Sequence, residues 1–126
     1  MKIKAAVLIQ TNQPLEIEEL TPPTLQKGQA LVKIAFSGVC HSQLNEVRGK
    51  KGEDRFLPHT LGHEASGIVE EVGPVTTKVK AGDTVVLTWI KGEGQDVPSA
   101  IYTRNDGSRV NSGAISTFMD FAVISE

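Results

Sequence analysis

Apolar and polar positions alternate along much of this chain, in short stretches that end at glycine or proline. Residues 15–18 read Leu-Glu-Ile-Glu, the period-two pattern of a half-exposed strand, and residues 3–9 form a more continuous apolar run. The sequence Asn105-Asp106-Gly107 is a strong hairpin turn signal. The remaining strand patterns cover residues 30–39, 65–72, 84–90, 101–103, 109–110 and 118–124.

One segment favours a helix. Leu44 and Val47 lie three positions apart within residues 41–48 and therefore share one helical face. Many short strands separated by turns, with a single short helix, predict a mainly β domain built as a closed or partly open barrel. A length of 126 residues fits one domain, and no glycine-rich phosphate-binding motif joins a strand to a helix. We expect Phe36 and Trp89 to lie in the core or to line the barrel.

Composition excludes several classes of function. Hydrophobic residues make up 39% of the chain, and 13 basic against 15 acidic residues give a net charge of −2. This balance predicts no binding to nucleic acid or to an anionic membrane, and no run approaches the ~18 apolar residues of a membrane span. We interpret the charged residues 48–54 as a solvated loop. A single cysteine cannot form an internal disulfide, which favours a cytoplasmic protein.

Two segments hold the candidate chemistry. Cys40 lies within residues 38–42 and His63 within residues 61–67, each where an apolar strand meets a glycine-rich corner. Singly, a cysteine is usually a small buried residue and a histidine an ordinary hydrogen-bonding one. Together, a thiolate and an imidazole make half or more of a zinc site. Ser42 adds a hydroxyl beside the cysteine, and Glu64 adds a carboxylate beside the histidine. These two groups favour a catalytic site over a merely structural one.

These motifs resemble those of a known family. Residues 38–42 read Gly-Val-Cys-His-Ser, residues 58–73 carry Gly-His-Glu-x-x-Gly and Val-Gly, and residues 79–85 carry Gly-Asp-x-Val. Over essentially its whole length the chain resembles the N-terminal, GroES-like catalytic domain of zinc-dependent alcohol dehydrogenases, in the medium-chain dehydrogenase/reductase superfamily. The resemblance implies a partly open GroES-like β-barrel with one or two short helices, spanning residues 1–126.

The resemblance also implies roles for individual residues. Cys40 and His63 would be two ligands of a catalytic zinc, and Glu64 a carboxylate close to the metal that ligates it transiently. Ser42 would hydrogen-bond the substrate oxygen and accept its proton. His41 occupies the position that lies near the cofactor pyrophosphate. The implied reaction is reversible oxidation of an alcohol to an aldehyde or ketone, with hydride transfer to NAD or NADP.

The chain departs from the family pattern at several positions. Gln43 stands where many members carry an aspartate that orients the zinc-bound histidine, and Asn45 stands where some carry a relay histidine. Residues 91–112 contain no cysteine, so we expect one catalytic zinc and no structural zinc. The Asn105-Asp106-Gly107 hairpin is expected to fill that lobe.

The largest difference from the family pattern is that this chain is shorter. In the family, the third zinc ligand and the Rossmann domain that binds NAD(P) lie downstream of the region that this chain covers. We therefore expect a fragment of a chain two to three times as long, inactive alone, which works with its own Rossmann domain in a homo-oligomer.

Two alternatives remain open at this stage. A non-enzymatic GroES-like interaction module would share the fold but leaves Cys40, His63 and Glu64 unexplained. A zinc-free relative of the quinone oxidoreductase type would also lack structural cysteines, but such relatives generally lack this ligand set. His59, Phe56 and Leu57 precede the ligand segment and are lesser candidates for the substrate pocket; an ordinary structural role is favoured for each.

Overall fold

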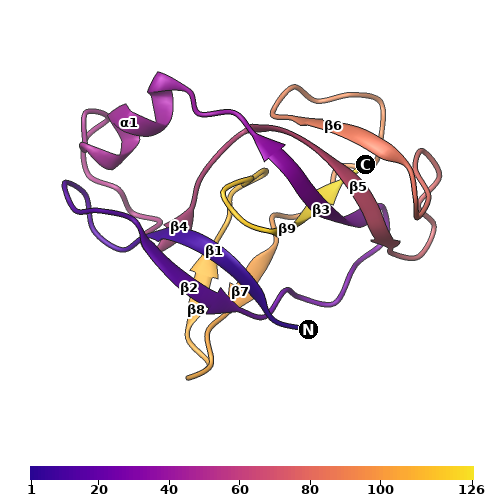
Figure 1. Ribbon diagram of the computed structural model, residues 1–126, viewed down its shortest axis with the longest axis horizontal. Coiled ribbons are helices and arrows are strands. Elements are labelled where there is room, and N and C mark those ends of the chain that lie inside the picture. Colours follow the sequence, from indigo (N-terminus) through magenta and orange to yellow (C-terminus); the bar gives the residue numbers. More distant parts are fainter.

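The computed structural model describes residues 1–126 and consists of two β-sheets with one short helix (Figure 1). The five-stranded sheet has the order β2-β1-β4-β8-β7, and the four-stranded sheet has the order β6-β5-β3-β9. The helix α1 spans His41–Val47, and the strands are β1 (Ile3–Leu8), β2 (Glu16–Leu20), β3 (Gln29–Ser37), β4 (His59–Thr60), β5 (Glu64–Val72), β6 (Thr84–Thr88), β7 (Ile101–Thr103), β8 (Arg109–Asn111) and β9 (Phe121–Ser125).

The first sheet is built around β1. Its side chains alternate across the sheet, so that Ile3, Ala5 and Val7 are buried while Lys4 is exposed. It pairs antiparallel with β2 on one side and with β4 on the other, and β4 pairs in parallel with β8. The hairpin of β7 and β8 completes this sheet, as the turn signal predicts.

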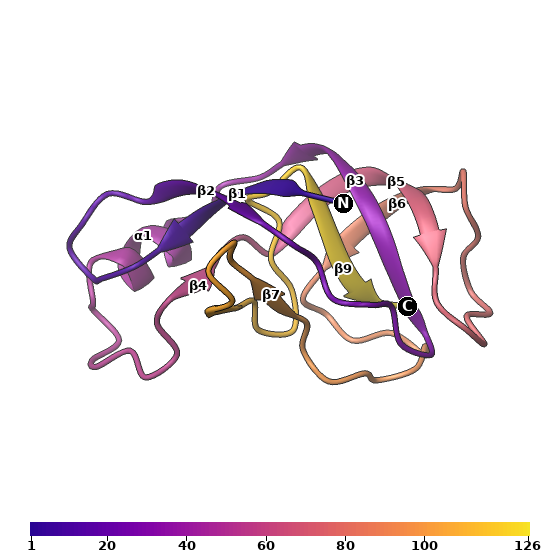
Figure 2. The ribbon, with the colours of Figure 1, turned by 90° about the horizontal axis from the view of Figure 1, so that it is seen from below.

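The second sheet is built around β3, which pairs antiparallel with both β5 and β9. Two register shifts interrupt the pairing of β3 with β5, and the second falls between Ile34 and Phe36. Such irregularities bend a strand and redirect its side chains. Figure 2 shows this sheet curving away from the first one at the other end of the molecule.

The core lies between the two sheets and is linked across them by Tyr102 of β7. Eleven buried residues, among them Leu20, Val110 and Ala122, form the larger cluster. Four buried residues of β3, β5 and β6 form the smaller one. The phenol oxygen of Tyr102 accepts a hydrogen bond of 2.8 Å from the backbone N–H of Val123 in β9. Burial raises the pKa of Tyr102 to about 12.

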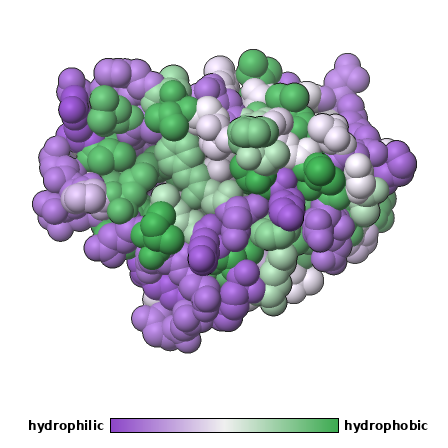
Figure 3. Space-filling view, in the orientation of Figure 1, coloured by the Kyte–Doolittle hydropathy of each residue, from purple (hydrophilic) through white to green (hydrophobic).

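The expected mainly β fold, with an open arrangement of strands and one short helix, is confirmed. Two expectations of burial are wrong: Phe36 is 79% exposed and Trp89 is 65% exposed. Phe36 follows the register shift in β3, and Trp89 follows the last residue of the edge strand β6. Figure 3 shows hydrophobic side chains over the region of β3, β5 and β6, where the exposed ones include Phe36, Ile68 and Val86.

Two strands also differ from the prediction. Strand β4 was not predicted, and β9 begins at Phe121 rather than at residue 118. The backbone of Phe118 instead bonds to Ala6 and Leu61, which belong to or lead from the first sheet. No helix of this chain is long and apolar enough to cross a membrane, since α1 contains only 7 residues.

Candidate functional site

The two candidate segments meet at one edge of the second sheet. Because β3 and β5 are antiparallel and Ser37 pairs with Ala65, the end of β3 lies beside the start of β5. The backbone N–H of Gly38 donates to the carbonyl of Glu64 at 2.9 Å. Cys40, just beyond β3, and His63, just before β5, are thereby held at the same corner.

Gln43 connects these two residues. It is buried on the first turn of α1, where Cys40 is the N-cap residue. Its side-chain Oε1 accepts a hydrogen bond of 2.9 Å from the backbone N–H of Cys40. Its Nε2 lies 2.8 Å from Nδ1 of His63 and 3.2 Å from the hydroxyl of Ser42. A single amide therefore spans the space between the cysteine and the histidine.

This connection determines the protonation of the imidazole. An amide nitrogen only donates hydrogen bonds, so Nδ1 of His63 must accept and the ring proton resides on Nε2. Nε2 in turn lies 3.5 Å from a carboxylate oxygen of Glu64. In this tautomer the ring proton lies on Nε2, the nitrogen nearer to Glu64, and it must move to Nδ1 before Nε2 can ligate a metal.

The thiol of Cys40 is activated by its neighbours. Hydrogen bonds from the Ser42 side chain and backbone, followed by one from the backbone of His41, lower the pKa of Cys40, while desolvation and the charge of Glu64 oppose them. A thiolate is the form that binds metal or attacks electrophiles. Ser42 therefore favours the ligating form of Cys40.

The remaining predicted residues are placed as follows. Glu64 is half exposed, with its carboxylate above Gly38, where an added Cβ would collide with it. The side chain of His41 is exposed on the first residue of α1, and Asn45 is half-buried on the same helix. The ligand atoms of Cys40, His63 and Glu64 do not all lie within 4.8 Å of one another. A soft thiolate donor beside an imidazole and a carboxylate nevertheless suits zinc chemically.

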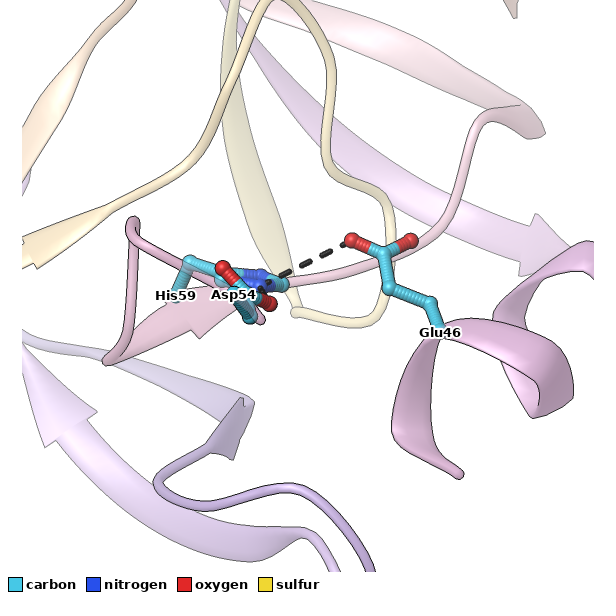
Figure 4. Close-up of side chains that lie close together, drawn as sticks. All are labelled: Glu46, Asp54 and His59. Atoms are coloured by element: carbon cyan, nitrogen blue, oxygen red, sulfur yellow. Dashed lines mark hydrogen bonds and ion pairs between the residues drawn. The ribbon is translucent and has the colours of Figure 1, made fainter. Parts of the chain in front are cut away.

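Sequence reasoning missed a second group of chemically capable side chains, shown in Figure 4. Nε2 of His59 lies 2.6 Å from Oδ2 of Asp54 and 3.6 Å from Oε2 of Glu46. Asp54 belongs to the loop that we interpreted as solvated, but its side chain is only 12% exposed. The three residues come from a loop, a strand and α1, so no local spacing in the sequence signals the group.

The second group and part of the first corner border one open cavity of about 690 Å³. Gln43 and His63 line it, as do Glu46, Asp54 and His59. Phe56 contributes to the same cavity, together with polar and charged side chains of the 49–55 loop. A cavity of this size is sufficient for a small organic molecule.

An open two-sheet β domain of this kind, with a cysteine and a histidine at one corner, is the fold expected of a GroES-like domain. A family model described as the alcohol dehydrogenase GroES-like domain matches residues 26–125. The chain belongs to this family, and the resemblance stated from its motifs is confirmed.

Similar proteins agree with this assignment. An alcohol dehydrogenase of Geobacillus stearothermophilus is 41% identical over 88 residues, covering 70% of this chain and 26% of the relative. An NDMA-dependent alcohol dehydrogenase of Amycolatopsis methanolica is 45% identical over 94 residues, covering 75% of this chain and 25% of the relative. The crystal structure of an alcohol dehydrogenase zinc-binding domain protein from Burkholderia ambifaria superimposes with a TM-score of 0.87 at 26% identity, covering 100% of this chain and 40% of that one. The matched regions thus span about a quarter of the length of these curated relatives.

Proposed function

We propose that this chain is the catalytic-domain portion of a zinc-dependent alcohol dehydrogenase, which oxidises an alcohol to an aldehyde or ketone with hydride transfer to NAD or NADP. The observation that carries the proposal is the antiparallel pairing of β3 with β5, which brings the thiol of Cys40 and the imidazole of His63 to one corner, where Gln43 bonds to both residues. The membership in the alcohol dehydrogenase family and the relatives named as alcohol dehydrogenases support it.

The proposed roles follow the chemistry of each side chain. Cys40 and His63 hold one zinc ion, with Glu64 as a nearby carboxylate that ligates it transiently. When bound, zinc supplies a Lewis acid and the nicotinamide accepts hydride. Ser42 hydrogen-bonds the substrate hydroxyl and takes its proton, a role for which its hydroxyl is already turned toward the cysteine. His41, exposed at the start of α1, faces the cofactor pyrophosphate.

The proposal includes parts outside this chain. Because the curated relatives are about four times as long as the matched region, we assign NAD(P) binding to a separate Rossmann domain and the third zinc ligand to downstream sequence. The substrate is a small alcohol or aldehyde, the complete protein is a cytoplasmic homo-oligomer, and residues 1–126 alone are inactive. The absence of cysteine from residues 91–112 supports a single catalytic zinc without a structural one.

Cobalt substitution tests the zinc site directly. A Co²⁺-loaded chain should show a near-ultraviolet thiolate-to-cobalt band, and Cys40→Ser should abolish it because this is the only cysteine. Ser99→Ala, an exposed change, is the matched control. If no thiolate band forms at any Co²⁺ concentration, the metal role of Cys40 is wrong, and the interaction module or the zinc-free relative takes its place.

Activity is tested on the complete gene product. Expressed with the coding sequence that follows codon 126, the wild-type protein should oxidise benzyl alcohol or a simple primary alcohol with NAD⁺ or NADP⁺. Cys40→Ser and His63→Ala should each lower kcat/KM by about three orders of magnitude or more, as expected when an essential metal is lost. Turnover by the 126-residue chain alone would contradict the inactivity proposed for it.

A further inference from the structure

The Glu46, Asp54 and His59 group shares no residue with the Cys40 and His63 corner. Glu46 extends from α1, Asp54 from the loop before β4, and His59 from β4 itself. Figure 4 shows Asp54 against the imidazole of His59 and the carboxylate of Glu46 facing them from α1. One ligand atom from each side chain lies within 4.8 Å of the others. Three separate elements therefore place the imidazole nitrogen of His59 and one carboxylate oxygen each of Glu46 and Asp54 close together.

The orientation of His59 is fixed from outside the group. Its Nδ1 lies 2.9 Å from the backbone carbonyl of Thr60, and because a carbonyl only accepts, Nδ1 must carry a proton. Nε2 is left facing the carboxylates, and the residue is only 6% exposed. Metal-ligating histidines likewise donate one ring N–H to a backbone carbonyl, which leaves the other nitrogen for the metal.

The charges around Nε2 do not balance without a cation. Two carboxyl groups face Nε2, with Asp54 at 2.6 Å and Glu46 at 3.6 Å. A proton on Nε2 would still leave two negative charges against one positive. Lys51 and Arg55 line the same cavity, yet no lysine or arginine forms an ion pair with Glu46 or Asp54. A divalent cation on neutral His59 would neutralise both carboxylates.

We propose that Glu46, Asp54 and His59 form a second metal site, which takes a divalent transition-metal ion through one imidazole and two carboxylates. Imidazole with carboxylates suits Zn²⁺, Mn²⁺, Co²⁺ and Fe²⁺, whereas Mg²⁺ and Ca²⁺ prefer oxygen alone. Two ligands about 2.1 Å from one ion lie about 3.0 Å apart in octahedral and about 3.4 Å apart in tetrahedral geometry, so Asp54, now 2.6 Å from Nε2 of His59, needs to move by less than an ångström. Three protein ligands leave further positions open toward the cavity.

Cobalt titration of a chain without the first corner tests this site. In the double variant Cys40→Ser/His63→Ala, isothermal titration with Co²⁺ should still show one ion per chain, without the thiolate-to-cobalt band. Adding Glu46→Gln or Asp54→Asn should weaken Co²⁺ binding at least tenfold. Glu53→Gln removes an exposed carboxylate from the same cavity and should leave the affinity unchanged.

The outcomes separate this site from the proposed catalytic zinc. If the double variant still binds Co²⁺ but shows no thiolate-to-cobalt band, the second site is supported. This holds whether or not the proposed zinc site at Cys40 and His63 is correct. Absence of Co²⁺ binding below millimolar concentration in the double variant overturns the second site, as does equal weakening by Glu46→Gln and Glu53→Gln. If Asp54→Asn does not fold, Glu46→Gln decides, because its side chain is 32% exposed and its change preserves shape.

Discussion

The side-chain amide of Gln43 lies 2.8 Å from Nδ1 of His63, with its nitrogen toward the ring. Its oxygen is occupied by the backbone N–H of Cys40, so the amide cannot turn over without losing that bond. The consequence is a histidine protonated on Nε2, the nitrogen nearer to Glu64. An aspartate at position 43 would accept from both partners and place the ring proton on Nδ1 instead.

We expect Gln43→Asp to strengthen zinc binding. A carboxylate at position 43 would free Nε2 of His63 for ligation, and partners of this kind are worth about 10–100-fold in metal affinity. Competition with a chromophoric chelator measures the change. Asn45→Asp adds the same charge two positions further along α1, at a side chain that forms no hydrogen bond with His63, and is the control. An equal gain in zinc affinity from both changes would attribute the effect to charge alone.

Gly67→Ala should destabilise the domain by about 1–3 kcal/mol. A Cβ at this position of β5 would collide with the backbone carbonyl of Lys33 in β3, and a backbone atom in a central strand cannot yield. Gly92→Ala, where nothing lies within 4 Å of the added atom, is the matched control. Urea unfolding followed by Trp89 fluorescence compares them, and equal midpoints would refute the close contact.

Tyr102→Phe should cost about 1–3 kcal/mol at pH 7, because the buried N–H of Val123 would lose its acceptor. Differential scanning calorimetry of the two chains gives the value. A smaller change would mean that water reaches Val123 once the hydroxyl is gone.

The same tyrosine predicts a loss of stability in alkali. Its pKa of about 12 in the folded chain exceeds the ordinary value of 10.0, so above pH 10 the unfolded chain releases a proton that the native chain retains. This contribution is complete below pH 10 and disappears as the pH rises toward 12. Urea midpoints from pH 9 to 12 should fall more steeply for the wild-type chain than for Tyr102→Phe, and parallel curves would contradict the shift.

Asp54 predicts the opposite dependence in acid. Its pKa is lowered in the folded chain, so its contribution is present above the ordinary carboxyl range and is lost as the pH falls below about 4. Asp54→Asn should flatten the decline of the urea midpoint between pH 6 and 3. Asp96→Asn, at a 76% exposed side chain, is the control and should follow the wild-type curve.

Local patterns were sufficient to predict most strands but not the connections between distant ones. An apolar run marked β1, which buries alternate side chains. Alternation marked β2, although Ile17 is exposed and Leu20 is the buried residue of that strand. Strand β4 has two residues, whose pairing with Leu8 and Asn111 is a property of the assembled sheet. Phe36 was expected to be buried because its apolarity is visible in the sequence while the register shift before it is not.

The candidate site residues show the same contrast between local sequence patterns and contacts that form only in the folded chain. Cys40 and His63 could be singled out because glycines and polar neighbours surround each of them locally. The direction of the Gln43 amide depends on which partner occupies its oxygen, and this is decided only when α1 is set against the corner. The approach of Glu46 to His59 has no counterpart in sequence spacing, since it depends on how α1 and β4 flank the cavity.

The position of β9 beside β3 has a consequence for biosynthesis. Gln29 pairs with Ser125, so one long edge of β3 stays unpaired until residues 121–125 have left the ribosome. An exposed strand edge is a template for wrong pairing, and non-local pairing of this kind slows folding. During translation β3 would therefore depend on chaperones or on rapid synthesis of residues 121–125 to escape aggregation.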